Sequence, residues 1–287
     1  MKTRRIGNTT VSAIGLGGMP LSIEGRPDDR SRSIATIHEA LDAGITFIDT
    51  ADAYHVDGTD IGHNETLIAE ALAAYGGDTS GVLVATKGGH TRPGGGSWDL
   101  NGTPEHLRSA CDESLKRLGV EAIGLYQFHR PDPKVPYAES IGGIRDLLDE
   151  GKIRMAGISN ADLTQIEEAN EILGGRLVSV QNEFSPAFRS SEPELDHCAD
   201  MGIAFLPWSP LGGISKASDL GAEHAAFREI AQSHGVSPQQ VTLAWMLGKG
   251  PHVIPIPGSS RPETIRDSAA AVDLTLSPDE MAALSRV

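Results

Sequence analysis

Short apolar runs alternate with segments of helical period along almost the whole chain. The runs lie at residues 13–19, 46–50, 82–87, 123–129, 153–160, 177–182, 203–209 and 252–260. Each is about four to eight residues long and mostly apolar, which is typical of β-strands that are covered on both faces. The pattern therefore predicts eight buried parallel strands.

The segments between these runs have the spacing and the end signals of helices. They span residues 31–44, 62–77, 103–119, 137–152, 161–175, 192–202 and 238–247, and a last one starts at residue 262. Gly44, Gly77 and Gly119 are typical helix stops, and Thr103-Pro104 is a typical helix start. Eight strand–helix units predict an α/β fold, the (β/α)8 TIM barrel, whose usual size is roughly 250 residues.

Three further segments complete this picture. Residues 4–12 predict an N-terminal β-hairpin that turns at Gly7-Asn8, and residues 277–287 predict an accessory C-terminal helix. The stretch 88–102 has six glycines in fifteen residues and predicts a long mobile loop on the catalytic face. We expect a single barrel domain over residues 1–287.

A doubly wound sheet is the competing fold for alternating strands and helices. Its first turn carries G-x-G-x-x-G, followed by an acidic residue about 20 positions later. The sequence GLGGMP at residues 15–20 lacks the third glycine at that spacing, and the next helical segment starts only near residue 31. The pattern therefore favours the barrel.

A polar side chain closes nearly every apolar run. In a barrel these positions meet at one face, where active sites lie. The runs end at Asp49, Lys87, His129, Ser159-Asn160, Gln181-Asn182, Trp208-Ser209 and Gly258-Ser259-Ser260. Any one of them can be a solvated rim residue or satisfy a backbone carbonyl, but together they point into one space.

Tyr54 lies five residues beyond Asp49, where its loop can fold back over the barrel mouth. A phenol has a pKa of about 10, which is high for proton transfer near neutrality. An ammonium such as Lys87 stabilises the phenolate, and a carboxylate such as Asp49 keeps that ammonium charged. His129 adds a hydrogen-bonding group for a polarised carbonyl oxygen. This set is suited to protonating an oxygen while a hydride arrives at its carbon.

The composition narrows the function classes. The 287 residues carry 24 Lys and Arg against 39 Asp and Glu, a net charge of −15, and no basic run offsets it. This balance argues against nucleic acid or an anionic membrane as a partner. No apolar stretch is long enough to span a bilayer or to act as a secretory signal, and two cysteines make no disulfide framework. We therefore expect a cytoplasmic protein. We also expect no metal site, because the ten histidines lack the spacing of metal ligands.

Seven motifs, in order along the chain, resemble those of the aldo-keto reductases. They are FIDTADAY (47–54), ATKGG (85–89), SLKRLGVEAIGLYQFHRPDP (114–133), GKIRMAGISN (151–160), VQNEFSP (180–186), WSPLGG (208–213) and IPGSSRPE (256–263). The resemblance implies NADPH-dependent reduction of an aldehyde or ketone to an alcohol. It matches Asp49, Tyr54, Lys87 and His129 to the family's catalytic tetrad, with Tyr54 as proton donor and His129 orienting the carbonyl.

The same resemblance implies a cofactor site along the strand ends. Ser159, Asn160 and Gln181 would hold the nicotinamide carboxamide, and Trp208 would stack on the ring. The 2′-phosphate would lie at the start of the last helix, where free N–H groups favour an anion. The full expected set is Gly17, Gly18, Met19, Asp49, Ser159, Asn160, Gln181, Trp208, Ser209, Pro210, Leu211, Gly213, Ile256, Gly258, Ser259, Ser260, Arg261, Asp267 and Ser268.

Two departures from the family pattern qualify these expectations. Gly258 stands where some relatives have lysine, which leaves NADH as a weaker second cofactor. The short C-terminal segment implies an open substrate pocket, shaped by Trp98 and its loop, by Phe184 and by residues 212–224. The expected partner is a small carbonyl compound, and the expected assembly is a monomer or a weak homo-oligomer.

Two other function classes remain open from the sequence. A non-catalytic or slow NADP(H)-binding redox sensor on the same fold would share the cofactor site, and turnover of a simple aldehyde would distinguish it. A Schiff-base lyase or aldolase would use Lys87 as nucleophile, which requires a lowered lysine pKa and no neighbouring carboxylate.

Overall fold

A curved parallel sheet forms the centre of the protein in a computed structural model that describes residues 1–94, 96–213, 216–217 and 220–286. Seven strands pair in the order β11-β10-β9-β8-β5-β4-β3. Apart from a hairpin inserted after β5, neighbours in the sheet are therefore neighbours in the chain. The strands are β3 (Leu16–Gly17), β4 (Phe47–Asp49), β5 (Leu83–Gly88), β8 (Leu125–Phe128), β9 (Ala156–Ser159), β10 (Leu177–Gln181) and β11 (Ala204–Phe205).

The last predicted run closes this sheet into a barrel. Parallel bridges join Phe205 of β11 to Val253 and Gly17 of β3 to Gly258, so residues 253–258 lie between the first and the seventh strand. The prediction of a (β/α)8 barrel is thus confirmed. The eighth run, however, pairs through isolated bridges and is not a continuous strand.

Two prolines explain the weak pairing of the eighth run. The N–H groups of Gly15 and Gly17 donate to the carbonyls of Pro255 and Pro257, each at 3.0 Å. A proline has no N–H, so neither residue can donate in return. The joint between this run and β3 therefore has fewer hydrogen bonds than a normal parallel ladder.

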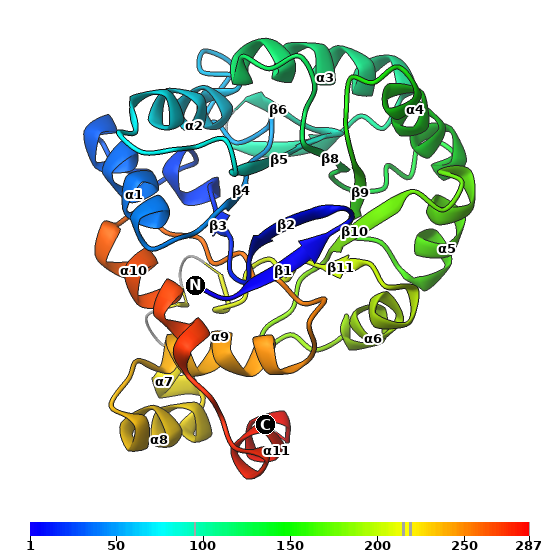
Figure 1. Cartoon of the computed structure of the whole chain (residues 1–287). Coiled ribbons are helices and arrows are strands. Elements are labelled where there is room, and N and C mark those ends of the chain that lie inside the picture. Colours follow the sequence, from blue (N-terminus) through cyan, green and yellow to red (C-terminus); the bar gives the residue numbers. More distant parts are fainter. Residues whose placement is uncertain (95, 214–215, 218–219, 287) are drawn as a thin grey trace.

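Helices form an outer ring around the barrel (Figure 1). They are α1 (Arg30–Asp42), α2 (His63–Ala74), α3 (Pro104–Leu118), α4 (Tyr137–Asp149), α5 (Leu163–Ile172), α6 (Glu192–Met201), α9 (Pro238–Gly248) and α10 (Pro262–Ala270). The predicted caps of α3 are present, because the Thr103 side chain accepts from the N–H of His106 and Gly119 ends the helix in the left-handed conformation. None of the helices within the described residues is long and apolar enough to cross a membrane.

Further short helices extend the ring. α7 (Leu220–Glu223) and α8 (Ala225–His234) precede α9, and the expected accessory helix is α11 (Pro278–Ser285). Two 3-10 turns, η1 (Met19–Leu21) and η2 (Ala271–Asp273), follow β3 and α10. The pair α7 and α8 was not predicted as helical.

The predicted N-terminal hairpin closes one end of the barrel. It consists of β1 (Thr3–Ile6) and β2 (Thr9–Ser12), and it crosses the centre of the view in Figure 1. Ile6 and Val11 are fully buried in one cluster with Phe47 and other inward-facing strand residues. The hairpin thus plugs the amino-terminal end and leaves the opposite end for a site.

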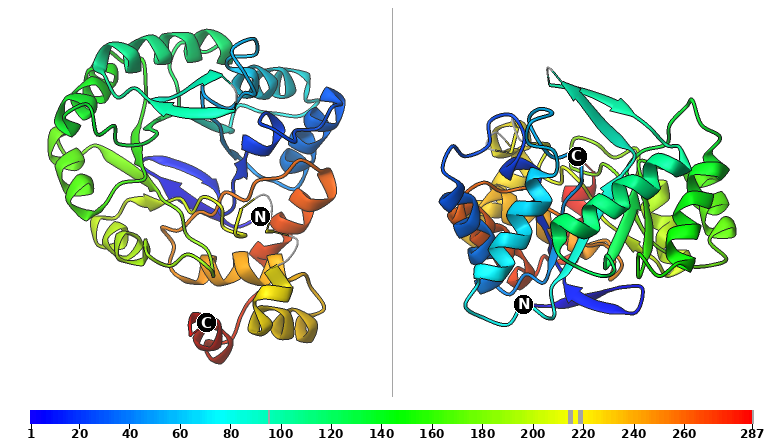
Figure 2. Two further views of the ribbon diagram at one scale, coloured as in Figure 1. Left: turned by 180° about the vertical axis from the view of Figure 1, so that it is seen from behind. Right: turned by 90° about the horizontal axis from the view of Figure 1, so that it is seen from above.

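A second hairpin stands at the other end of the barrel, where the sequence predicted a mobile loop. β6 (His90–Gly94) and β7 (Ser97–Leu100) pair antiparallel between β5 and α3. In the right-hand view of Figure 2 it projects from the end opposite to β1 and β2. The loop prediction was therefore wrong: the glycine-rich segment contains two paired strands.

Candidate active site

Three of the predicted catalytic side chains form a buried, hydrogen-bonded centre at the carboxyl end of β4 and β5. The Lys87 ammonium donates to Asp49 Oδ2 at 2.6 Å, to the Tyr54 hydroxyl at 3.1 Å and to the backbone carbonyl of Thr50 at 2.9 Å. The Lys87 side chain is fully buried and that of Asp49 is 3% exposed. All three donor positions of the ammonium are thus filled, which fixes its orientation.

The electrostatics of this centre differ in one respect from the expectation. Burial raises the pKa of Tyr54, and this effect exceeds the lowering that the Lys87 ammonium causes. Burial lowers the pKa of Lys87, but the Asp49 carboxylate and Tyr54 raise it more, so the net direction is upward. Tyr54 is therefore a protonated phenol at neutral pH, beside a charged ammonium.

His129, the fourth predicted residue, faces Tyr54 across the site. Their ring centroids are 5.8 Å apart with the planes at 80°. Burial, and then the charge of Lys87, lowers the pKa of His129 well below its usual value. Its ring is therefore neutral near pH 7, and its buried Nδ1 has no hydrogen-bond partner among the described residues. A neutral imidazole can hydrogen-bond a carbonyl oxygen without adding a charge.

A cavity of about 960 Å³ opens from this centre and runs along the strand ends to the start of α10. This volume suits a ligand of drug or cofactor size. Twenty of the predicted residues line it, namely Gly17, Met19, Asp49, Tyr54, His129, Ser159, Asn160, Gln181, Trp208, Ser209, Pro210, Leu211, Gly213, Ile256, Gly258, Ser259, Ser260, Arg261, Asp267 and Ser268.

Two predicted residues lie behind the cavity wall. Lys87 reaches the cavity only through Asp49 and Tyr54. Gly18 donates its N–H to the carbonyl of Asp49 at 2.8 Å, and a Cβ there would lie 2.6 Å from Asn64 Oδ1. Gly18 thus permits a close approach of chain segments and does not contact the cavity.

The predicted walls of the substrate pocket are only partly correct. Trp98 lines the cavity, as do Gly213 and Ala217 of the expected segment 212–224, whereas residues 214–215 and 218–219 lie outside the described residues. Phe184 is fully buried and stacks on Trp245 with centroids 5.5 Å apart. Phe184 is therefore a core residue, and its prediction as a pocket wall was wrong.

Backbone strain occurs at two of the residues predicted to bind the cofactor. Asn160 and Ser209 are the non-glycine residues with positive φ among the residues described, at 58° and 49°. Such conformations are uncommon and cluster at functional sites. Asn160 is held there because its side chain donates to the carbonyl of His129 at 2.9 Å and accepts from Arg130 at 2.9 Å.

The side chain of Gln181 has a second role that the sequence did not indicate. Its Nε2 donates to Asp49 Oδ1 at 2.8 Å, and Gln127 Nε2 approaches the same oxygen at 3.3 Å. Both carboxylate oxygens of this buried side chain are thus hydrogen-bonded. Gln181 connects the buried centre to the cavity.

The far end of the cavity lies at the N-terminus of α10. Ser259, Ser260 and Arg261 lie there together, and α10 starts at Pro262. The Arg261 side chain is 54% exposed, and its Nε lies 3.7 Å from the carboxylate of Glu263. Helix N-termini with an arginine attract anions, whereas Glu263 opposes one.

Several lining residues were not singled out from the sequence. They are Pro20, Ile23, His90, Arg130, Gln239, Glu263 and Thr264. Pro20, Arg130 and Glu263 each lie within two positions of a predicted residue, and this is the one signal that could have found them. Ile23 lies in the loop after η1 and His90 begins β6, and the positions of both depend on tertiary packing.

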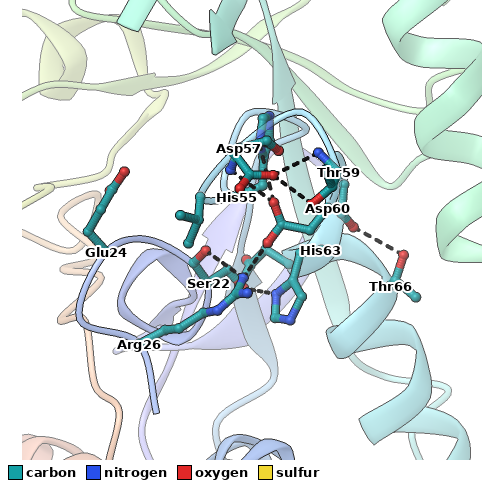
Figure 3. A network of polar contacts seen from close by, with 12 residues as sticks. Ser22, Glu24, Arg26, His55, Asp57, Thr59, Asp60, His63 and Thr66 are labelled. Carbon is teal, nitrogen blue, oxygen red and sulfur yellow. Dashed lines mark hydrogen bonds and ion pairs between the residues drawn. The ribbon is translucent and has the colours of Figure 1, made fainter. Parts of the chain in front are cut away.

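A polar network fixes the loop that continues from Tyr54 (Figure 3). Arg26 forms an ion pair with Asp60, and Ser22 lies 2.7 Å from His63 Nδ1. These contacts join the segment after η1 to the first residue of α2 and to the loop that precedes it. They limit the freedom of the Tyr54 loop at the cavity mouth.

The described part of the chain contains no group of three or more His, Cys, Asp or Glu side chains that could hold a metal ion. The lysine chemistry of an aldolase is also disfavoured. That reaction needs a neutral amine, and Asp49 lies 2.6 Å from the Lys87 ammonium. The site therefore contains a buried phenol, a lysine–aspartate ion pair and a neutral imidazole, a set of groups suited to reduction or oxidation at a carbonyl carbon.

Comparisons with known proteins agree with this class. The model of the aldo/keto reductase family matches residues 13–287, and the chain belongs to that family. It is 35% identical over 285 residues to an uncharacterized oxidoreductase of Schizosaccharomyces pombe, covering 98% of this chain and 88% of the relative. It is 36% identical over 281 residues to the 6-dehydroglucose reductase of Novosphingobium aromaticivorans, covering 94% and 90%.

A solved structure gives the same result. The aldo/keto reductase of Klebsiella pneumoniae, crystallised with NADP and acetate, superposes with a TM-score of 0.81 at 27% identity, covering 99% of this chain and 94% of that one. The protein is thus an oxidoreductase of the aldo-keto reductase family on a barrel fold.

Proposed function

We propose that this protein is an NADPH-dependent carbonyl reductase in which Tyr54 donates the proton. The observation that carries the proposal is the Lys87 ammonium, which bridges Asp49 at 2.6 Å and the Tyr54 hydroxyl at 3.1 Å. A charged lysine beside a phenol stabilises the phenolate that proton donation leaves behind.

The cavity residues fit a dinucleotide of this kind. Ser159, Asn160 and Gln181 offer hydroxyl and amide groups near the centre, and Trp208 offers an aromatic face. Arg261 and the start of α10 suit the 2′-phosphate. The Klebsiella pneumoniae structure contains NADP, and the present cavity runs from the buried centre to the start of α10.

The bound cofactor would supply a hydride to the carbonyl carbon. The residues of the chain then have separate tasks. His129, as a neutral imidazole, hydrogen-bonds and orients the carbonyl oxygen. Tyr54 transfers its phenolic proton to that oxygen as negative charge develops there. Lys87, held by Asp49, stabilises the resulting phenolate until solvent returns a proton.

The substitution Tyr54→Phe tests this function. It removes the proton donor and keeps the ring, so we expect at least about a hundredfold loss of aldehyde reduction, with NADPH affinity changed only a few-fold. NADPH consumption and NADPH binding measure the two quantities. Full activity in this variant would contradict the mechanism. Tight NADPH binding without turnover by the natural protein, over a broad panel of aldehydes and ketones, would instead favour the redox sensor.

A further inference from the structure

Trp98 on the β6–β7 hairpin has an unusual combination of exposure and position. Trp98 is 42% exposed and lines the cavity. The other exposed large hydrophobic residues in the described part of the chain do not line the cavity. Trp98 is thus both accessible and part of the cavity lining.

The inner face of this indole is clamped by a buried arginine. The Arg92 guanidinium carbon lies 4.3 Å from the Trp98 ring centroid, and the Arg92 side chain is 1% exposed. Arg92 Nη2 forms an ion pair with Glu24 and donates to the carbonyl of Val56 at 3.3 Å. Burying a guanidinium is costly unless it is paired. These contacts tie Trp98 to the segments on both sides of the cavity mouth.

A row of rings connects Trp98 to the catalytic phenol. Trp98 and His90 have centroids 5.4 Å apart, His90 and His129 4.2 Å, and His129 and Tyr54 5.8 Å. Each pair meets edge to face, at 79°, 83° and 80° respectively. A substrate whose carbonyl lies at Tyr54 and His129 therefore has an aromatic wall beside it that ends at the open indole.

Ile23 adds an apolar side chain to the cavity lining, and it directly precedes Glu24, the ion-pair partner of Arg92. Arg130 is a charged side chain near the same row of rings: it adds to burial in lowering the pKa of His90 and His129, and it donates to Asn160 Oδ1 at 2.9 Å. Apolar side chains beside a fixed indole favour a ring that is itself apolar over a hydroxylated chain. The aromatic wall therefore favours substrates in which the group attached to the carbonyl is an apolar ring.

From this geometry we infer that Trp98 determines substrate specificity and that the preferred substrates carry an aromatic ring a short distance from the carbonyl. The inference rests on the proposed carbonyl reduction. The aromatic ring packs on the open face of the Trp98 indole, and Arg92 holds the indole in place. Trp98 takes no part in the proton transfer itself.

Two aldehydes separate the role of the ring from the chemistry. Propanal and 3-phenylpropanal have the same unconjugated aldehyde and differ only by the phenyl group. We expect Trp98→Ala to lower kcat/KM for 3-phenylpropanal by about tenfold more than for propanal, because an aromatic pair and its buried area are lost. Trp98→Phe keeps a ring and should recover most of the difference. Arg92→Met, which releases the clamp, should lower the same ratio in part.

Phe188→Ala is the matched control, since it removes an aromatic ring that is 39% exposed and outside the cavity lining. It should leave both substrates unchanged. Equal losses for propanal and 3-phenylpropanal in Trp98→Ala would overturn the inference. A larger loss of kcat/KM for glyceraldehyde than for 3-phenylpropanal in Trp98→Ala would overturn it too, because Trp98 would then favour a hydroxylated substrate over an aromatic one.

A separate measurement keeps this test independent of the proposed reaction. The affinity for 3-phenylpropanol, measured by calorimetry without turnover, should fall about tenfold in Trp98→Ala. If the natural protein reduces no aldehyde, the proposed function fails, and this affinity alone decides the role of Trp98. An unchanged affinity for 3-phenylpropanol in Trp98→Ala would refute the packing of an aromatic ring on the Trp98 indole, even if Tyr54→Phe abolishes turnover.

Discussion

Replacing Asp49 by asparagine would remove one negative charge from the buried centre without changing the shape of the side chain. The hydrogen bonds can survive this change. The asparagine oxygen can accept from Lys87, and its amide can donate to Gln181 if the Gln181 amide turns over. Asp49→Asn is therefore a deletion of charge, and its effect measures what the carboxylate does for the ammonium.

The structure sets the size of the effect. At the observed separation of 2.6 Å, the attraction between the two charges is about 6 kcal/mol for an effective dielectric constant of about 20. Removing one partner of a buried pair costs about 3–5 kcal/mol in practice. The lysine can relieve this cost by losing its proton, so the substitution moves the pKa of Lys87 down toward the neutral range.

Two pH profiles measure this shift. In the natural protein the pKa of Tyr54 is raised and that of His129 lowered, so kcat/KM for reduction should be flat from about pH 6 to about pH 9. In Asp49→Asn it should fall as pH rises, because reduction needs the charged lysine. Stability should change in the opposite sense: a folded-state lysine pKa below the unfolded value makes the variant gain stability as pH rises.

Urea denaturation at several pH values gives the second readout. Asp132→Asn is a suitable control, because Asp132 is also buried but accepts from backbone N–H groups of Gly102 and Lys134. It should leave the activity profile flat. An Asp49→Asn variant with a flat profile and an unchanged urea midpoint would refute the view that the carboxylate keeps Lys87 charged.

Two further predictions concern the ends of the barrel. Arg261→Ala should weaken NADPH binding about ten- to a hundredfold and leave NADH binding unchanged, whereas Glu263→Gln should strengthen NADPH binding. Titrations of each variant with both cofactors measure these affinities. Equal losses of NADPH and NADH affinity in Arg261→Ala would mean that Arg261 has a structural role only. Arg4→Met should lower the free energy of unfolding by about 2–4 kcal/mol and leave kcat unchanged. The reason is that Arg4 donates to the carbonyls of Leu247 and Gly250, each at 2.6 Å. An unchanged midpoint of urea denaturation would contradict this prediction.

The sequence predicted the barrel well because its evidence is periodic. Buried parallel strands need continuous apolar runs, and the polar residue after each run marks the carboxyl end. Asp49, Lys87 and His129 were found in this way, and the structure brings them to one place with Tyr54. The eighth run was predicted as a strand from its apolar residues alone. That pattern takes no account of the N–H groups that Pro255 and Pro257 lack.

Other parts of the site depend on packing that leaves no periodic signal. The stretch 88–102 is rich in glycine, so its composition indicated a loop, yet Arg92 and Trp98 hold it as a hairpin. Phe184 follows a strand end, as a pocket residue would, but it turns inward against Trp245. Such choices are made by contacts between distant segments, which one sequence does not display.

The two prolines of the eighth run have a consequence for ligand binding. They leave the seam between that run and β3 with fewer hydrogen bonds than a normal parallel ladder. The bridged residues of the seam, Gly17 and Gly258, also line the cavity. A dinucleotide lying along the strand ends would cross this seam and fasten it. With the cofactor bound as proposed, its affinity and the closure of the barrel would be coupled, because a ligand that binds only the closed barrel stabilises it.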